Sequence, residues 1–490
     1  MYRIVEGNTR GLADAEDFVR MLQKLENSPV REAQNLFSKK AELLVARAPG
    51  RLDLMGGIAD YSGSLVLQMP IREATMVAVE RSEKREVRIV SLPCEADPRP
   101  ARSLDLPLME LESNGQPIEY AEARERFARQ PKDAWAAYVA GVILVLMREK
   151  SAPFHAGLSL LIDSRVPEGK GVSSSAALEV AAMCAVAAAQ NLKLEASEMA
   201  LLCQKVENLV AGAPCGVMDQ MTAACGQENC LLALLCQPAR LQGFVAIPEG
   251  LAVTGIDSGV RHAVTGAAYG EVRAGAFMGY RIIADRARLS VEASEADGLV
   301  RIEDPRWGGY LANITPEEFQ REYAASLPEE IAGAEFLARY GGTTDEVTRV
   351  QAEKNYAVRT PAAHPIFENS RVHAFQELLR GDPDDEKFRQ MGELMYQSHA
   401  SYSACGLGEE RTNLLVQLCR NCDPTRGAFG AKITGGGSGG TVAFLSSNAE
   451  SPLEEIAEGF TRVTGERPHI FSGSSPGAVE FGILRLRAVD

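Results

Sequence analysis

The stretch from Val166 to Leu178 constrains the chain most, because it places a turn rich in glycine and serine between a strand and a helix. The apolar run 158–162 predicts the strand, and the run 176–190, rich in Ala, Met and Leu, predicts the helix. Glycine lets several N–H groups converge, and the first helical turn adds unpaired N–H groups with partial positive charge. The stretch therefore predicts an anion site, and a nucleotide phosphate is the expected anion.

Two familiar phosphate motifs do not match this stretch. No Lys-Ser or Lys-Thr pair closes it, as a Walker loop requires, and its glycine spacing differs from the dinucleotide fingerprint. A run of glycine and serine before a helix can also be only a capped loop. Taken alone, the stretch leaves the phosphate site and the capped loop as alternatives.

Length and charge limit the classes of function. A chain of 490 residues allows about two to four domains, at roughly 150 residues each. A net charge of -15 argues against a nucleic-acid backbone or an anionic membrane as partner, but not against a nucleotide held with a metal ion. Residues 1–22 lack the apolar core of a signal peptide, and the apolar run 134–147 is shorter than the ~20 residues of a membrane span.

The ten cysteines are scattered along the chain, which is typical of a reducing cytoplasm. Cys419 and Cys422 form a lone C-x-x-C pair. Because no second pair or neighbouring histidine accompanies it, a surface helix is favoured over a zinc site.

Two further glycine-rich segments stand between apolar flanks. Residues 47–63 follow the start of a strand at 42–46, predict a loop, and carry Arg51 and Asp60. This loop is either an ion-paired turn or a site for a sugar or phosphate. Residues 431–442 hold five glycines and predict a close approach of backbone to a ligand or to another segment. Runs 75–81 and 87–91 predict the two strands of a hairpin.

Two single residues are candidates for chemistry. Asp219 follows a Pro- and Gly-rich helix break and lies among apolar residues, so it either pairs structurally or acts as a base. Trp135 stands near the start of a helix, where an aromatic side chain either joins the core or stacks on a ligand.

Three motifs occur in a characteristic order: A-P-G-R-L-D-L-M-G-G-I-A-D-Y at 48–61, P-E-G-K-G-V-S-S-S-A-A at 167–177 and K-I-T-G-G-G-S-G-G-T at 432–441. This order resembles the GHMP small-molecule kinases, and galactokinases in particular, from about Leu43 to the C-terminus. The run G-G-I-A-D-Y-S-G-S-L-V-L-Q-M-P-I at 56–71 resembles the kinase portion of L-arabinokinases still more closely.

The resemblance implies an α+β fold of two lobes with the active site in the cleft between them. Residues 1–245 would form a ribosomal S5-like N-terminal lobe, with a helical extension at 1–40. Residues 246–490 would form a ferredoxin-like C-terminal lobe that carries the third motif.

The resemblance also implies a cytoplasmic sugar 1-kinase that uses ATP and Mg²⁺ to phosphorylate the anomeric hydroxyl of L-arabinose. Asp219 matches the catalytic aspartate and Arg51 the arginine beside it. The matching nucleotide-binding residues are Gly169, Gly171, Ser173, Ser174, Ser175, Gly436 and Gly437, with Trp135 near the adenine. Ser175 and Glu207 match the magnesium ligands. The matching sugar-binding residues are Gly57, Ile58, Asp60, Gly216 and Tyr269, together with Arg51 and Asp219.

One departure from galactokinases bears on the sugar. Those enzymes have Glu-His where this chain has Gly57 and Ile58, at the C6 end of the sugar. L-Arabinose has the ring stereochemistry of D-galactose without the C6 hydroxymethyl arm, so an apolar wall there would leave O6 of galactose without a partner. We therefore expect a preference for arabinose of about tenfold or more. Ser438 replaces the usual Phe, with no consequence that we can derive.

Three other functions compete with this interpretation. A galactokinase or broad sugar kinase is the alternative within the class. A non-catalytic sugar and ATP sensor is expected to lack Arg51, Asp219 or the phosphate loop, and all three are present. A dinucleotide-binding oxidoreductase would need the fingerprint that the chain lacks.

Overall fold

The computed structural model describes residues 2–40, 42–94, 100–261, 267–294, 298–381, 384–423, 426–448 and 452–488. Its largest sheet has nine strands, and seven of them follow in the order β1-β19-β2-β3-β8-β4-β5. In that order the strands are β1 (Tyr2–Glu6), β19 (Leu484–Ala488), β2 (Glu42–Met55), β3 (Leu65–Ser82), β8 (Gly157–Ser164), β4 (Glu86–Ser91) and β5 (Arg102–Pro107). The remaining two are β9 (Cys230–Leu235), which pairs with β3, and β10 (Arg240–Ala246), which pairs with β9.

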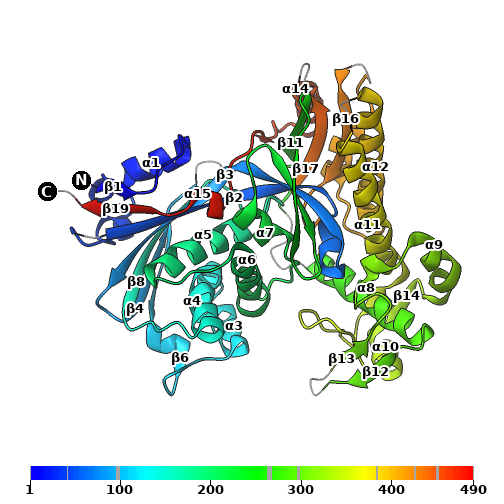
Figure 1. Ribbon diagram of the computed structural model, residues 1–490, viewed down its shortest axis with the longest axis horizontal. Coiled ribbons are helices and arrows are strands. Elements are labelled where there is room, and N and C mark those ends of the chain that lie inside the picture. Colours follow the sequence, from blue (N-terminus) through cyan, green and yellow to red (C-terminus); the bar gives the residue numbers. More distant parts are fainter. Residues whose placement is uncertain are drawn as a thin grey trace.

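Helices cover both faces of this sheet (Figure 1). One face carries α4 (Ala137–Lys150), α5 (Ser174–Ala189), α6 (Ala196–Lys205) and α7 (Met218–Cys225), and the other carries α1 (Ala13–Leu22). Alternate residues of β3 serve the two cores: Val77 packs with the α4–α7 side, whereas Met76 and Ala78 pack with α1. This period of two is what a strand buried on both faces requires.

The predicted hairpin of 75–81 with 87–91 is wrong, because β8 lies between the two strands. β8 pairs antiparallel with β3 and parallel with β4. Its run 158–162 is apolar and almost fully buried, which suits a central position in the sheet. The predicted loop at 47–63 is also wrong in its first part, since β2 continues to Met55. Irregular register between Pro49 and Arg51 and between Asp53 and Met55 lets this strand contain the turn-forming residues.

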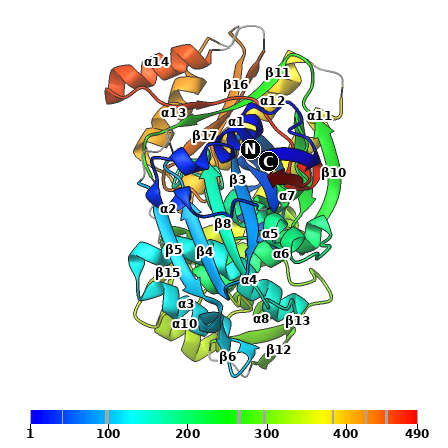
Figure 2. The same cartoon turned by 90° about the vertical axis from the view of Figure 1, so that its left-hand side faces the viewer.

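A second, antiparallel sheet has the order β16-β17-β11-β18. Its strands are β16 (Ala428–Ile433), β17 (Thr441–Ser447), β11 (Leu251–Asp257) and β18 (Ile470–Phe471). The long helices α11 (Arg359–Leu379) and α12 (Asp385–Ala404) stand beside it, with α13 (Glu410–Arg420) and α14 (Leu453–Thr464) (Figures 1 and 2). The α+β class is therefore confirmed.

A third group of elements packs around α8 (Ala267–Arg286) at the lower right of Figure 1. It contains β12 (Ser290–Ala293), β13 (Val300–Glu303), α9 (Pro316–Glu318), η7 (Phe319–Tyr323), η8 (Ala324–Ser326), β14 (Glu330–Ala332), α10 (Gly333–Tyr340) and β15 (Asn355–Ala357). Ile58 and Tyr61 belong to the same hydrophobic cluster as these elements. The first motif is therefore anchored in this group.

The two ends of the chain lie side by side at one edge of the large sheet (Figures 1 and 2). β19, from the C-terminal half, pairs with both β1 and β2. The division into two lobes between residues 245 and 246 stays a prediction. β19 belongs to the second half of the chain but returns to the sheet of the first half. The expected helical extension at 1–40 contains α1 and α2 (Arg31–Gln34) but begins with a strand, because Tyr2–Glu6 completes the sheet edge beside β19.

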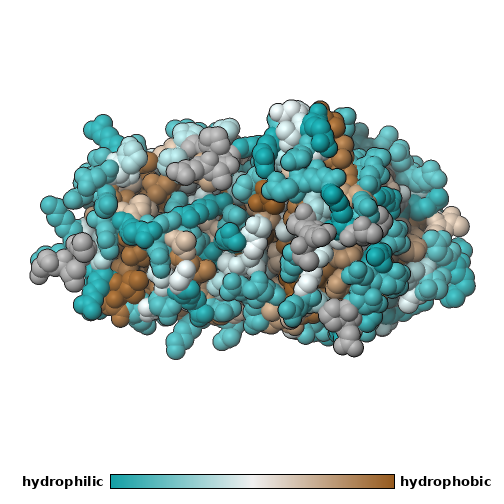
Figure 3. Space-filling model, turned by 90° about the horizontal axis from the view of Figure 1, so that it is seen from above, coloured by the Kyte–Doolittle hydropathy of each residue, from teal (hydrophilic) through white to brown (hydrophobic). Residues whose placement is uncertain are grey.

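The remaining elements are short or connect the others. They are η1 (Leu25–Asn27), η2 (Gly57–Ser62), η3 (Leu108–Leu111), β6 (Glu112–Ser113), β7 (Gln116–Pro117), α3 (Tyr120–Ala128), η4 (Pro131–Ala136), η5 (Val206–Ala211), η6 (Leu311–Asn313) and α15 (Ala478–Phe481). Among the described residues, no helix is both long enough and apolar enough to cross a bilayer. The face seen in Figure 3 is largely hydrophilic, in keeping with the net charge of -15.

Candidate active site

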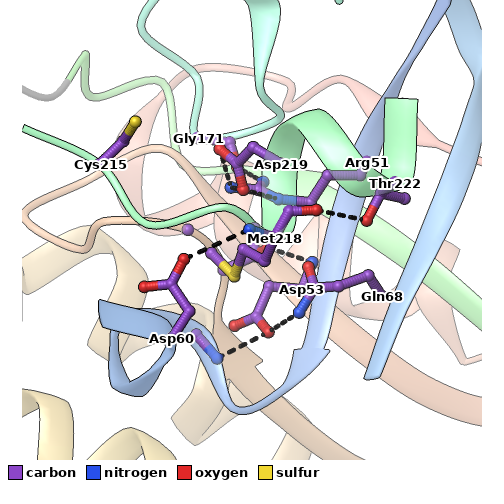
Figure 4. Close-up of polar contacts among 12 residues, drawn as sticks. Arg51, Asp53, Asp60, Gln68, Gly171, Cys215, Met218, Asp219 and Thr222 are labelled. Atoms are coloured by element: carbon purple, nitrogen blue, oxygen red, sulfur yellow. Dashed lines mark hydrogen bonds and ion pairs between the residues drawn. The ribbon is translucent and has the colours of Figure 1, made fainter. Parts of the chain in front are cut away.

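Arg51 and Asp219 form a two-pronged ion pair at the centre of the candidate site (Figure 4). Arg51 projects from β2, and Asp219 lies in the first turn of α7. Arg51 Nε and Nη2 donate to the two carboxylate oxygens of Asp219, each over 2.9 Å. The Arg51 side chain is 3% exposed and that of Asp219 is 21% exposed, so the carboxylate keeps a face toward solvent. The geometry fixes the orientation of a carboxylate that a small substrate can still reach.

The same arginine joins this pair to the predicted phosphate loop. Arg51 Nη1 donates to the carbonyl oxygen of Gly171 over 2.6 Å. Gly169 and Gly171 have φ angles of 71° and 70°, which a side chain would disfavour, and Ser173 stands just before α5 with φ of 61°. The predicted aspartate, arginine and loop therefore meet at one place.

The third motif packs directly against the second. Thr441 Oγ1 donates to the carbonyl oxygen of Lys170 over 2.8 Å. A Cβ on Gly435 would lie 2.9 Å from the Gly171 oxygen and 3.1 Å from Arg51 Nη2. A Cβ on Gly436 would lie 3.7 Å from the Tyr269 ring, and Gly437 lies against Leu407. The glycines of this loop thus allow both backbone and side chains of other segments to approach closely.

Glu207 belongs to a buried group of carboxylates beside the start of α5. It lies in the π-helical turn η5 and is 8% exposed, and Gln220 Nε2 donates to its Oε2 over 2.6 Å. Burial raises the pKa of Glu207 to about 7, and a hydrogen bond with Ser175 opposes that shift. Burial, followed by the charge of Glu207, raises the pKa of Glu179 well above its usual value.

The oxygen atoms of this group are of the kind that bind a hard cation such as Mg²⁺. Ser175 and Glu207 supply a hydroxyl and a carboxylate, and Ser173 Oγ, Glu179 Oε1 and Gln220 Oε1 are buried without a hydrogen-bond partner among the described residues. No three His, Cys, Asp or Glu side chains in the described part of the chain cluster as a metal site. Sequence reasoning missed Glu179 and Gln220, although a single glutamate within the apolar helix 176–190 is a signal for Glu179.

Asp60 and Gly216, both predicted sugar contacts, lie against each other. Asp60 is 4% exposed, Met218 N donates to its Oδ2 over 3.5 Å, and its Oδ1 has no hydrogen-bond partner in the described structure. Burial, and then the charge of Asp219, raises the pKa of Asp60 to about 7. A Cβ on residue 216 would lie 1.8 Å from Asp60 Oδ2, so only glycine fits there. Tyr269 packs edge-on against Tyr61, with 5.8 Å between ring centroids.

Three consecutive backbone N–H groups of the first motif are each held by a side chain from a different segment. Gly56 N donates to Glu368 Oε1 over 3.2 Å, Gly57 N to Asp53 Oδ1 over 3.0 Å, and Ile58 N to the Tyr402 hydroxyl over 2.8 Å. These acceptors lie on α11, β2 and α12. The conformation of the Gly57–Ile58 turn is therefore set by Asp53 of the same motif and by two side chains from outside it, Glu368 and Tyr402.

An ion pair within the core supports the same turn. Lys432, from β16, contacts Asp53 Oδ2, and both side chains are fully buried. Gln68 Nε2 donates to Asp53 Oδ1 over 2.6 Å (Figure 4). The Tyr402 hydroxyl also donates to the carbonyl oxygen of Gly435 over 3.1 Å, which links the first motif to the third. Sequence reasoning missed Glu368 and Tyr402, because no local pattern marks them.

Trp135 lies in η4 at the edge of the core that α4 and α5 share. The guanidinium of Arg102 lies 5.7 Å from its ring centroid, and Arg102 Nη2 donates to both carboxylate oxygens of Glu168, over 3.0 and 2.9 Å. Trp135 is thus next to the predicted phosphate loop, and its role near an adenine stays a prediction.

Comparisons with known proteins agree with this geometry. Residues 137–227 match the family described as "GHMP kinases N terminal domain". Residues 34–81 match the family described as "Galactokinase galactose-binding signature". The chain is 45% identical to the L-arabinokinase of Arabidopsis thaliana over 99% of its own length, and it spans about half of that relative, 52%. It is 30% identical to a galactokinase of Chloroflexus aggregans, covering 86% of the chain and 88% of the relative.

A solved structure shares the fold. The Lactococcus lactis galactokinase complexed with galactose superposes with a TM-score of 0.69 at 20% identity, covering 95% of this chain and 99% of that one.

Proposed function

This chain is a member of the galactokinase-like GHMP kinases, and from that premise we propose that it phosphorylates the anomeric hydroxyl of L-arabinose with ATP. The products are L-arabinose 1-phosphate and ADP. The observation that carries the proposal is the set of bonds from Arg51 to Asp219 and to Gly171, since it joins a carboxylate and a phosphate loop in one site. We propose the cytoplasm as compartment, since scattered cysteines suit reducing surroundings.

Asp219 acts as the base in this proposal. Its carboxylate orients the C1 hydroxyl and takes its proton as the hydroxyl oxygen bonds to the γ-phosphorus, and the bond to the bridging oxygen of ADP breaks. Arg51 keeps the carboxylate in one orientation through its paired hydrogen bonds and lies beside the path of the transferred group. Positioning of this kind accounts for most of the catalysis of phosphoryl transfer.

The start of α5 holds the ATP phosphates. Gly169, Gly171, Ser173 and Ser174 provide N–H and hydroxyl donors at the positive end of the helix. Ser175 and Glu207 would hold Mg²⁺, which supplies positive charge that offsets the phosphate oxygens, and the raised pKa of Glu207 reflects a buried carboxylate that a cation would stabilise. Gly436 and Gly437, which belong to the third motif, lie beside the nucleotide, and Trp135 lies toward the adenine.

The sugar lies against Asp60, Gly216, Tyr269 and the Gly57–Ile58 turn. Ile58 is 1% exposed and belongs to a hydrophobic cluster, so it offers no partner for a C6 hydroxyl. An unpaired hydroxyl costs galactose roughly 1–3 kcal/mol relative to arabinose. D-Galactose is the alternative substrate, because residues 34–81 match the galactose-binding signature.

An assay of ATP consumption with L-arabinose, D-galactose and D-galacturonate tests the proposal. We expect the highest kcat/KM with L-arabinose and no turnover of galacturonate, since Lys432, a cation near Gly57, is fully buried and already paired with Asp53. Asp219→Asn is expected to lower kcat by about 10²–10⁴-fold and to leave sugar binding largely intact. Wild-type kcat in that variant would refute Asp219 as the base, and equal kcat/KM for arabinose and galactose would refute the sugar assignment.

A further inference from the structure

A cavity of about 460 Å³ lies between α11, α12 and the short helices η7 and η8, and none of its lining residues belongs to the candidate active site. Its volume falls within the roughly 300–1,000 Å³ of small-molecule sites. Phe319 and Phe367 form an aromatic wall, with ring centroids 6.2 Å apart. Such a space is large enough for a small organic molecule, not only for an inorganic ion.

The lining carries positive charge in an acidic protein. Arg359 and Arg371 line the cavity, and none of its described lining residues is acidic. Arg371 is held by Glu368, whose Oε2 accepts from Nε over 2.8 Å. Arg359 Nε and Nη2 donate to the carbonyl oxygen of Leu327, and its Nη1 donates over 3.2 Å to Glu329, a side chain that is 84% exposed. A guanidinium has five N–H donors, and these bonds leave donors on both arginines for an anion.

His364 has one ring nitrogen without a hydrogen-bond partner among the described residues. It lines the cavity and is 1% exposed, its Nδ1 shares a hydrogen bond with Ser401 Oγ over 2.7 Å, and its Nε2 is buried with no hydrogen-bond partner among the described residues. A buried polar atom without a partner is costly, and a bound molecule can supply that partner.

Two contacts run from this cavity to the sugar-binding turn. Arg371 pairs with Glu368, which accepts from Gly56 N. His364 packs edge-on against Tyr402, with ring centroids 5.2 Å apart, and Tyr402 accepts from Ile58 N. A ligand that moves Arg371 or His364 therefore acts on the groups that hold the Gly57–Ile58 turn.

We propose that this cavity binds a small phosphomonoester of sugar-phosphate size and that its occupancy changes the affinity of the active site for its sugar. The phosphate pairs with Arg359 and Arg371, the remainder packs on Phe319 and Phe367, and His364 Nε2 bonds to it. The effect on the sugar rests on the proposed function, whereas binding to the cavity does not.

Thr360 gives a test that leaves the catalytic residues untouched. It lines the cavity in the first turn of α11, where a carboxylate is compatible with the helix, so Thr360→Glu adds a repelling charge without a burial cost. Thr360→Gln is the matched control of equal size and no charge. Calorimetric titration of the full chain with D-ribose 5-phosphate, inorganic phosphate and L-arabinose 1-phosphate measures binding, and KM for the sugar is measured with and without ribose 5-phosphate.

We expect ribose 5-phosphate to bind the wild type and Thr360→Gln and to bind Thr360→Glu at least about tenfold more weakly. It should change the sugar KM by about fivefold or more in the first two proteins only. If the reaction product is the natural ligand, L-arabinose 1-phosphate should show a second binding event that Thr360→Glu lacks. Binding of inorganic phosphate alone would reduce the site to a simple anion site and overturn the proposal.

Equal binding of ribose 5-phosphate to all three proteins, or none at about 10 mM, would overturn the site. Binding without a change in KM would overturn the coupling. A wild type that binds ribose 5-phosphate in this pattern but does not phosphorylate arabinose would refute the proposed function and leave the site standing.

Discussion

The hydroxyl of Tyr402 occupies the space that any side chain on Gly57 would need. A Cβ built on Gly57 would lie 1.6 Å from that oxygen and 2.8 Å from Asp53 Oδ2. Gly57 also has a φ of 44°, which disfavours other residues. The glycine at this position is therefore required by a residue 345 positions later in the chain, whether or not it also contacts the proposed sugar.

This relationship predicts the effect of filling position 57. Gly57→Ala should lower the free energy of unfolding by about 1–3 kcal/mol, because the Cβ overlaps the Tyr402 hydroxyl. Tyr402→Phe removes that oxygen, so the double variant should lose less than the sum of the two single losses. Urea denaturation of the four proteins measures this difference, and simple additivity would contradict it.

The apolar wall at Ile58 predicts a change in sugar preference. Ile58→His gives a C6 hydroxyl a partner, so the ratio of kcat/KM for arabinose over galactose should fall by about fivefold or more. Ile58→Val keeps the wall apolar and serves as the control, with a ratio close to that of the wild type. Steady-state kinetics on both sugars gives the ratios, and no difference between the two variants would refute a role for this wall.

Asp60 predicts a dependence of stability on pH. Its pKa is raised from 3.8 to about 7 in the folded protein, so the folded state binds the extra proton between these values. The contribution of Asp60 to stability is therefore present at low pH and is lost as the pH rises through about 7. Asp60→Asn should lose less stability than the wild type between about pH 5 and pH 8 in urea titrations. Parallel curves for the two proteins would contradict the shift.

The buried pair of Asp53 and Lys432 predicts a large loss on breaking it. Lys432→Met leaves the Asp53 carboxylate buried without its cation, which should cost about 3–5 kcal/mol. Lys84→Met is the matched control, since Lys84 is 80% exposed and its removal should cost less than about 0.5 kcal/mol. Denaturation curves provide the comparison, and similar losses in both variants would show that the pair contributes little.

Glu207 predicts opposite effects on stability and on metal use. Glu207→Gln removes a buried carboxylate whose pKa is raised to about 7, so the protein without metal should be more stable than the wild type above that pH. The concentration of Mg²⁺ for half-maximal activity should rise by about tenfold, since a ligand is lost. Thermal unfolding and a Mg²⁺ titration measure the two effects. A lower midpoint together with an unchanged Mg²⁺ requirement would contradict both.

Local sequence predicted several parts of this site well. The strand, the glycine-rich turn and the helix around Ser173 follow from apolar runs and turn residues that are adjacent in the chain, and the structure has them as β8, the loop and α5. Arg51 and Asp219 were expected together from motifs whose order resembles a known family, and the structure pairs them. The sequence did not predict that β8 lies between β3 and β4, because strands that are neighbours in the chain need not be neighbours in the sheet.

The sequence by itself determined which chemical groups are present and the local turns that present them, because propensity and the freedom of glycine act over a few residues. Only the tertiary structure decided that Glu368 and Tyr402 hold the Gly56 and Ile58 N–H groups, and that Lys432 neutralises Asp53. These partners lie 312, 344 and 379 residues apart in the chain. Such pairs are selected by the packing of whole helices and strands, because burial makes an unpartnered polar group costly wherever its partner lies in the sequence.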